Sequence, residues 1–309
     1  MPEFSIVITV YNRERLVPRA VQSCLRQEGA AFEVIVVDDG SNDNSALAVE
    51  SLGDPRITIV RHDANRGGPA ARNSGSAVAK GDWVVMLDSD DELLPGALQS
   101  MSRVAREQGD AVERLGFMYR RDDGRVSPLP ALRDELLDYV GELRWLEDRL
   151  FFDFLQCTRR STFDHIRWRE WKSAGYLLYL SDFAAMYRTF FSSEVLGLVH
   201  LDASERASWE SRTRRFAAGA AKDLGEEIDV ILARHGDALR RYVPSVFRRY
   251  QRVRASYYFL TGSIGQGARQ CLRCLRESPL SAETWVQLLV GLSGPRPFGW
   301  LRSFRPPPT

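Results

Sequence analysis

The stretch that decides the fold is residues 83–91, WVVMLDSDD. Its five leading apolar residues, two of them β-branched, predict a strand buried on both faces of a sheet. Alternate side chains of an extended chain share a face, so Asp88 and Asp90 are expected to point toward one site while Asp91 turns aside. The competing interpretation is an acidic turn that caps a helix beginning near Leu93.

Paired carboxylates in one small site repel each other unless a cation or a proton lies between them. Mg²⁺ and Mn²⁺ prefer oxygen ligands and commonly bind one or two carboxylates together with substrate phosphates. The pair Asp88 and Asp90 therefore predicts a site for one of these ions and for a phosphate-bearing substrate.

The first hundred residues alternate between strand-like and helix-like segments. Apolar, β-branched runs predict strands, and apolar residues three and four positions apart predict helices. The expected strands are 4–10, 32–37, 57–60 and 83–87, and the expected helices are 16–25, 45–52, 69–78 and 93–109 with Pro95 in its first turn. This alternation is typical of parallel strands joined by crossover helices.

The later elements follow a less regular order. The expected strands are 112–119, 151–157 and 195–201, and the expected helices are 136–150 and the second half of 168–191. Residues 121–124 are an expected hairpin turn. From about residue 211 onward the pattern is helical.

Polar side chains follow each of the first four strands, at the sheet edge where ligands bind in open parallel sheets. They are Tyr11, Asn12, Asp38, Asp39, Arg61, His62, Asp88 and Asp90. The glycine-rich motifs that cradle phosphates in dinucleotide-binding and P-loop proteins are absent from the sequence. A metal on Asp88 and Asp90 is the alternative way to handle phosphate charge.

The net charge of +1 conceals an asymmetry. Residues 211–309 carry 17 basic and 7 acidic side chains, a net of +10, which leaves −9 for residues 1–210. The acidic front half fits a metal site and argues against nucleic acid as a partner. The basic rear half is interpreted either as a surface for peripheral contact with an anionic membrane or as a solvated helical face. Without a signal-peptide pattern or a membrane-spanning apolar run, we expect a cytoplasmic protein, with any membrane contact at the inner face.

The order of these motifs resembles that of the family 2 glycosyltransferases, which share the α/β GT-A fold. The segments that carry the resemblance are SIVITVYNRERLVPRAVQSCLRQ, FEVIVVDDGSNDNS, NRGGPAARNSG and GDWVVMLDSDDELLPGAL. It implies a GT-A domain over residues 1–210 with a mostly parallel central sheet. A nucleotide-binding part would extend to about residue 110 and an acceptor part over 111–210, followed by a helical region over 211–309.

The resemblance also implies a role for individual residues. The nucleotide-sugar would be bound by Tyr11, Asp38, Asp39, Arg72 and Asp88, and a Mn²⁺ or Mg²⁺ ion by Asp88, Asp90 and His200. Structural interpretations compete with these roles. Tyr11 also fits an ordinary aromatic at a strand end, Asp39 a turn residue, and His200 a packing residue; Arg72 also fits a partner of an acid on a helix surface.

The catalytic base has two candidates. Inverting members of the family use a carboxylate, usually in a Glu-Asp motif at the start of a helix, about six residues before an Arg. Asp182 lies six residues before Arg188 and matches this spacing with Ser181 in place of Glu. Glu170, next to Trp171, is the rival.

The implied activity is metal-dependent, inverting transfer of a sugar from a nucleoside-diphosphate sugar, with UDP the favoured nucleotide. The acceptor would be a glycan or a lipid-linked saccharide in surface polysaccharide synthesis. The alternative is a non-catalytic protein that binds a nucleotide-sugar or glycan on the same fold. A nucleotidyltransferase would need a Gly-rich basic loop after the first strand, and residues 10–13 do not provide one.

Overall fold

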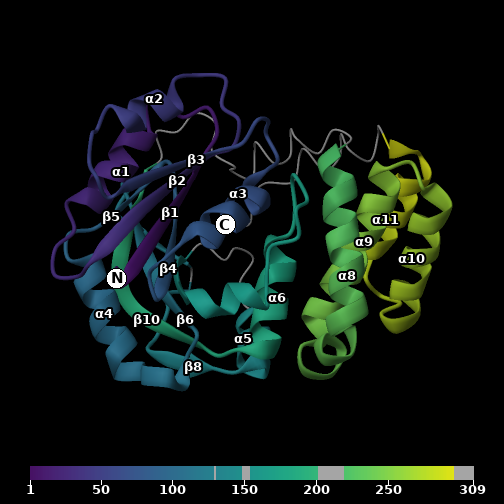
Figure 1. Ribbon diagram of the computed structural model, residues 1–309. Coiled ribbons are helices and arrows are strands. Elements are labelled where there is room, and N and C mark those ends of the chain that lie inside the picture. Colours follow the sequence, from purple (N-terminus) through teal and green to yellow (C-terminus); the bar gives the residue numbers. More distant parts are fainter. Residues whose placement is uncertain (129, 148–153, 201–218, 296–309) are drawn as a thin grey trace. The chain divides into compact units, whose positions relative to one another are not determined.

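The computed structural model describes residues 1–128, 130–147, 154–200 and 219–295 (Figure 1). The chain divides into two units. Unit 1 comprises residues 1–171 and 182–204, and unit 2 comprises residues 172–181 and 205–309. The domain boundary expected at residue 210 falls outside the described residues.

Unit 1 is built on a mixed sheet, and its first four strands are parallel and neighbouring. They are ordered β3-β2-β1-β4, with β1 at Phe4–Val10, β2 at Phe32–Asp38, β3 at Ile57–Arg61 and β4 at Trp83–Asp88. The connecting helices are α1 (Val17–Leu25), α2 (Ser45–Glu50) and α3 (Gly68–Val78). The prediction of alternating parallel strands and crossover helices is confirmed.

Helices cover both faces of these strands, which explains their continuous apolar runs. Ile6 and Ile8 of β1 belong to a core that also includes residues of α1 and α4 (Ala97–Gln108). On the opposite face, α3 packs against β1 and β2. A Cβ atom on Gly75 would lie 2.4 Å from Val7 Cγ1, so only glycine allows α3 to approach this closely.

The second half of the sheet mixes strand directions. β9 (Leu155–Arg159) lies antiparallel between β4 and β6 (Arg114–Arg121), and β10 (Thr189–Val199) lies parallel to β6. A short β5 (Asp91–Leu93) is antiparallel to β10. The remaining elements are β7 (Val126–Ser127), β8 (Glu135–Leu137), α5 (Tyr139–Trp145), α6 (Tyr176–Met186) and the 3₁₀ turns η1 (Gly109–Ala111) and η2 (Arg160–Asp164).

The helix expected over 93–109 is wrong at its start. The chain forms β5 first and turns at Gly96, whose φ is +78°, before α4 begins at Ala97. Pro95 therefore precedes the helix. β5 exists because it pairs with β10, a partner too distant in sequence for a local pattern to reveal.

Other expected boundaries also differ from the structure. The expected helix 136–150 is wrong at its start, because residues 136 and 137 belong to β8. The helix that forms is α5, and Asp138 caps it by accepting a hydrogen bond from the Gly141 amide at 2.8 Å. β6 extends from 114 to 121, and β9 begins at residue 155; of the expected strand 151–157, residues 151–153 lie outside the described residues. β10 begins at Thr189, within the segment expected to be helical, because β6 and β8 pair with it there.

Unit 2 contains α8 (Gly219–Tyr242), α9 (Pro244–Leu260), α10 (Ile264–Glu277) and α11 (Ala282–Leu292). The helical prediction is confirmed for these described residues. A small core joins the last three helices through Ala255, Phe259, Cys271, Leu275 and Leu288. None of the described helices is both long and apolar enough to cross a membrane.

Candidate active site

The carboxyl ends of the parallel strands lie side by side, as the motif positions predict. Val10 pairs with Asp38, Thr9 with Asp88, and Asp38 with Arg61. This register places the polar residues that follow each strand along one edge of the sheet.

Hydrogen bonds connect the loop after β1 to the loop after β2. The Asn12 amide donates to Ser41 Oγ at 3.0 Å, and the Asn42 amide donates to Asn12 Oδ1 at 2.8 Å. Asn12 has a φ of +52°, in the left-handed region that asparagine tolerates better than most residues. The preceding Tyr11 is 39% exposed at the end of β1, so part of its ring is available for stacking.

Asp38 and Asp39 are buried, and the loop amides satisfy their carboxylates. Asp39 accepts hydrogen bonds from the amides of Arg66 at 2.9 Å and Gly67 at 2.7 Å, and its Oδ1 lies 2.7 Å from Nδ1 of His62. Asp38 accepts one from the Ser41 amide at 3.0 Å. In this structure both side chains shape the loops around the site.

Gly40 permits the close contact between these loops. Its φ is +71°, and a Cβ atom there would lie 2.6 Å from the backbone carbon of Ala64. The loop that Asp39 holds leads directly into α3. Asp39 and Gly40 therefore hold the loop that precedes α3.

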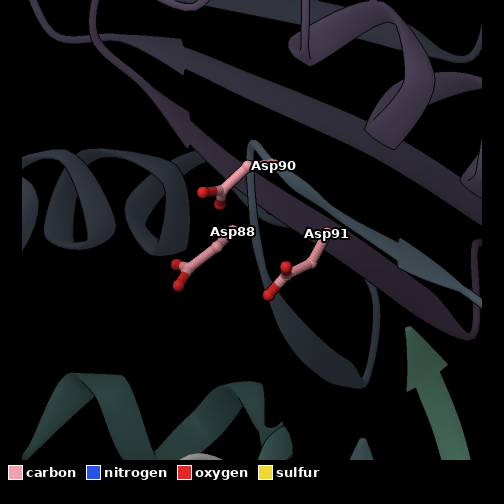
Figure 2. Close-up of side chains that lie close together, drawn as sticks. All are labelled: Asp88, Asp90 and Asp91. Carbon is pink, nitrogen blue, oxygen red and sulfur yellow. The ribbon is translucent and has the colours of Figure 1, made fainter. Parts of the chain in front are cut away.

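Three carboxylates gather at the end of β4 (Figure 2). Asp88, Asp90 and Asp91, hereafter the acid cluster, each offer an oxygen within 4.8 Å of the other two. The expectation that Asp91 turns aside is wrong. The chain reverses at residues 89–90 and enters β5 at Asp91, so the alternation of an extended strand does not apply. Asp91 is buried, whereas the Asp88 side chain is 57% exposed.

Two arginines contact the acid cluster. Arg72 of α3 places Nη2 3.1 Å from Asp88 Oδ1, so its acidic partner belongs to the site itself. Arg19 of α1 donates from Nη2 to the backbone carbonyl of Asp90 at 3.1 Å. Nothing in the local sequence around Arg19 indicates this contact, because it joins residues 71 positions apart.

His200 lies beside the acid cluster and contacts another acid. Pairing of Val199 with Asp91 brings the end of β10 next to β5. Nε2 of His200 lies 2.6 Å from Glu92 Oε1, and Arg26 also pairs with Glu92 at 3.2 Å. Metal binding by His200 stays a prediction, and its Nε2 would have to leave Glu92 to serve as the ligand.

Glu170 is connected to α3. Its Oε2 lies 2.7 Å from Arg66 Nη2, and its Oε1 accepts a hydrogen bond from Asn73 Nδ2 at 3.2 Å. Burial disfavours the charged form of Glu170, but the hydrogen bonds from Asn73 and Arg66 outweigh it and lower the pKa of this carboxyl. Since Asn73 adjoins Arg72, one helix contacts both Glu170 and the acid cluster. Sequence reasoning did not single out Arg66 or Asn73, although both lie in the quoted NRGGPAARNSG segment.

Asp182 lies inside α6 and does not begin a helix as the family pattern implies, because α6 starts at Tyr176. It is partly buried, and the pKa of the nearby Tyr139 is raised first by burial and then by the negative charge of Asp182. Its neighbour Phe183 is fully buried. The role of Asp182 as base stays a prediction.

Comparison with known proteins identifies the family to which the sequence of this chain is similar. The family described as Glycosyl transferase family 2 matches residues 5–171. Similar curated proteins include the succinoglycan biosynthesis protein ExoO of Rhizobium meliloti, 40% identical over 109 residues, or 35% of this chain and 31% of that protein. The putative colanic acid biosynthesis glycosyl transferase WcaA of Escherichia coli is 40% identical over 135 residues, 42% of this chain and 47% of that one.

A third relative is the GalNAc(5)-diNAcBac-PP-undecaprenol beta-1,3-glucosyltransferase of Campylobacter jejuni, 36% identical over 110 residues, or 35% of this chain and 36% of that protein. In each case the match spans less than half of the relative's length.

Solved structures share the fold. S. aureus TarS 1–349 in complex with UDP-GlcNAc has a TM-score of 0.61 and 18% identity, over 94% of this chain and 89% of that one. The mannosyltransferase PcManGT of Pyrobaculum calidifontis, in complex with GDP-Man and Mn²⁺, has a TM-score of 0.57 and 18% identity, over 98% and 87%. The fold is therefore GT-A, as the sequence resemblance implied.

Proposed function

The chain belongs to the family 2 glycosyl transferases, and on this premise we propose that it moves a sugar from a nucleoside-diphosphate sugar, preferably a UDP-sugar, in a metal-dependent, inverting reaction. The acceptor is a glycan or a lipid-linked saccharide in surface polysaccharide synthesis. The observation that carries the proposal is the acid cluster at the end of β4, with Arg72 in contact with Asp88.

The donor set of the acid cluster fits a hard divalent cation. Three carboxylate oxygens within 4.8 Å of one another are the ligand type that Mg²⁺ and Mn²⁺ prefer. Asp88 and Asp90 would hold the ion, and an oxygen of Asp91 lies within 4.8 Å of theirs. When bound, such an ion supplies Lewis-acid stabilisation of a diphosphate leaving group.

The surrounding residues suit the rest of a nucleotide-sugar. The half-exposed ring of Tyr11 offers a stacking surface for a base at the end of β1. Arg72 offers charge-assisted hydrogen bonds to a diphosphate beside Asp88. Asp38 and Asp39 support nucleoside binding by holding the loops on either side, and a direct contact would require their oxygens to accept further hydrogen bonds.

A carboxylate base would take the proton of the acceptor hydroxyl while its oxygen attacks the anomeric carbon opposite the diphosphate, and one such displacement inverts the configuration. The contacts favour Glu170 over Asp182, because Asn73 joins Glu170 to the helix that carries Arg72. Glu170 must loosen its ion pair with Arg66 to act. Glu170→Gln and Asp182→Asn, compared in a sugar-release assay at equal nucleotide occupancy, separate the two.

The experiment that tests the proposal is isothermal titration with UDP, GDP and dTDP, each with Mn²⁺ and then with EDTA. We expect metal-dependent binding of one diphosphate, strongly weakened in Asp90→Ala. Asp82→Ala is the matched control, since Asp82 is an exposed acid just before β4 and outside the acid cluster. Absence of binding to every diphosphate with Mn²⁺ present would contradict the proposal.

One observation keeps a second function in view. Neither base candidate begins a helix, in contrast to the pattern of inverting relatives. A non-catalytic nucleotide-sugar-binding protein would bind the diphosphate in this titration and release no sugar with any acceptor.

A further inference from the structure

Helix α11 presents apolar side chains on its solvent side as well as on its buried side. Thr284, Leu288 and Gly291 face the core of unit 2. The exposed apolar residues, hereafter the α11 face, are Trp285 at 45%, Val286 at 51%, Leu289 at 65% and Leu292 at 54%. No charged residue occurs between residues 284 and 295. Helices on a protein surface normally carry polar residues there, and a clustered apolar surface marks an interaction site.

The α11 face belongs to a well-anchored helix. Ser281 caps α11 by accepting a hydrogen bond from the Thr284 amide at 3.3 Å, and Trp285 Nε1 donates to the Pro279 carbonyl at 2.9 Å. A Cβ atom on Gly291 would lie 2.4 Å from the Phe259 ring, so the helix packs closely on α9. The indole of Trp285 is therefore held at the surface. Leu280, just before the helix, adds a side chain that is 96% exposed.

Basic side chains accompany the α11 face. The neighbouring helix α10 packs against α11 (Figure 1). It carries three exposed arginines four and three positions apart, a spacing that places them on one side of that helix. They are Arg269, Arg273 and Arg276.

We propose that the α11 face docks onto an anionic lipid bilayer, with the apolar side chains in the interfacial region and the arginines beside the head groups. Eleven residues are too few to span the hydrocarbon core, so α11 would lie in the plane of the interface. Trp285 suits this level, where tryptophan is enriched. A second copy is a poorer partner, because pairing would bring together two regions that each carry a net charge of +4 over residues 219–295, whereas anionic lipid complements that charge.

The test is co-sedimentation of the full chain with vesicles of phosphatidylcholine alone and with one quarter phosphatidylglycerol. We expect binding to the anionic vesicles only, weakened at about 0.5 M NaCl by screening. Trp285→Ser with Leu289→Ser removes much of the apolar contact and should weaken binding by tenfold or more. The matched control is Leu47→Ser on α2 of unit 1, which is 59% exposed and should bind like the unmodified chain.

Circular dichroism and UDP titration on the same variants separate docking from folding and from the nucleotide site. We expect the double variant to keep its helical signal and its UDP affinity. Equal or absent binding to both vesicle types would overturn the inference. So would a concentration-dependent dimer in analytical ultracentrifugation that the double substitution abolishes, since the α11 face would then bind a second copy. Neither outcome bears on the proposed transferase activity.

Discussion

Two clusters of charged side chains in unit 1 differ in burial and in the number of carboxylates. In the first, hereafter the buried pair, the Arg114 side chain is fully buried, with Nη2 2.6 Å from Glu142 Oε2 and Nε donating to Thr189 Oγ1 at 3.0 Å. The acid cluster, by contrast, gathers three carboxylates in one turn and reaches the surface at Asp88. The buried pair matches one cation with one carboxylate, whereas the acid cluster gathers three carboxylates near Arg72 and Arg19.

This difference separates charges that support the fold from charges that prepare a site. The ring centroids of Phe183 and Phe154 lie 4.2 and 5.9 Å from Cζ of the Arg114 guanidinium. Burial raises the pKa of Glu142, although the positive charge of Arg114 opposes this shift. Removing one partner of such a pair is strongly destabilising, because it leaves an uncompensated buried charge. Repulsion within the acid cluster costs free energy that folding alone does not require, which is typical of a ligand site.

The largest expected effect is on the buried pair. Arg114→Met leaves Glu142 buried without its cation, and we expect the free energy of unfolding to fall by about 3–5 kcal/mol. Urea unfolding measures this. Arg103→Met, at an exposed arginine of α4 whose ion pairs with Glu107 and Glu194 lie at the surface, is the control and should change stability far less. A loss below about 1 kcal/mol for Arg114→Met would show that the pair is not structural.

A double substitution sharpens that result. Arg114→Met with Glu142→Leu removes both charges and replaces them with apolar side chains. We expect it to recover much of the stability lost in Arg114→Met, because replacing both members of a buried ion pair is often neutral. If the double variant is no more stable than Arg114→Met in urea unfolding, the shape of these side chains, rather than their charge, dominates at this position.

Asp90→Asn, unlike Arg114→Met, should impair turnover more than stability. We expect turnover to fall about 10²–10³-fold, since Lewis-acid stabilisation contributes several kcal/mol. Tm without metal should not fall, because one charge leaves a repulsive group. Added Mn²⁺ should raise Tm in the unmodified chain and in the control Asp82→Asn, but not in Asp90→Asn. A Mn²⁺-induced shift retained in Asp90→Asn would remove the acid cluster as the metal site.

Arg72→Gln tests the arginine that contacts Asp88, and we expect it to reduce function less than Asp90→Asn does. Charge-assisted hydrogen bonds contribute about 1.5–3 kcal/mol, so we expect UDP binding with Mn²⁺ to weaken about ten- to hundredfold in calorimetry. Urea stability should change little, because the partner Asp88 is exposed. Arg103→Gln is the control, and equal affinities for both variants would exclude a contact between Arg72 and the diphosphate.

The smallest expected effect concerns Glu170, whose pKa is lowered whereas that of Glu142 is raised. A carboxyl with a lowered folded-state pKa contributes stability above its unfolded pKa, near 4.5, and loses it as the pH falls through the folded value. At pH 6 the unmodified chain should therefore be more stable than Glu170→Gln by less than about 1 kcal/mol. This difference in the free energy of unfolding should disappear as the pH falls to 3. A constant difference would mean that Glu170 is not held as the carboxylate.

Local sequence patterns predicted the parallel half of the sheet almost residue by residue. β1, β2, β3 and β4 each consist of a β-branched apolar run, and each is followed by the polar residues expected at its end. The second half departed from prediction where pairing is distant. β5 and the start of β10 have no periodic pattern of their own, and both exist because other strands pair with them.

The sequence by itself determined the family, the GT-A fold and the presence of acids at adjoining strand ends, because these depend on short motifs and on alternation within one strand or helix. Only the tertiary structure decided that Asp91 joins Asp88 and Asp90, that Arg19 contacts their turn, and that Glu92 lies between Arg26 and His200. The last contact joins residues 108 positions apart. Contacts of this kind depend on how the chain reverses and which strands pair, and these choices minimise the free energy of the whole packed unit rather than of any local segment.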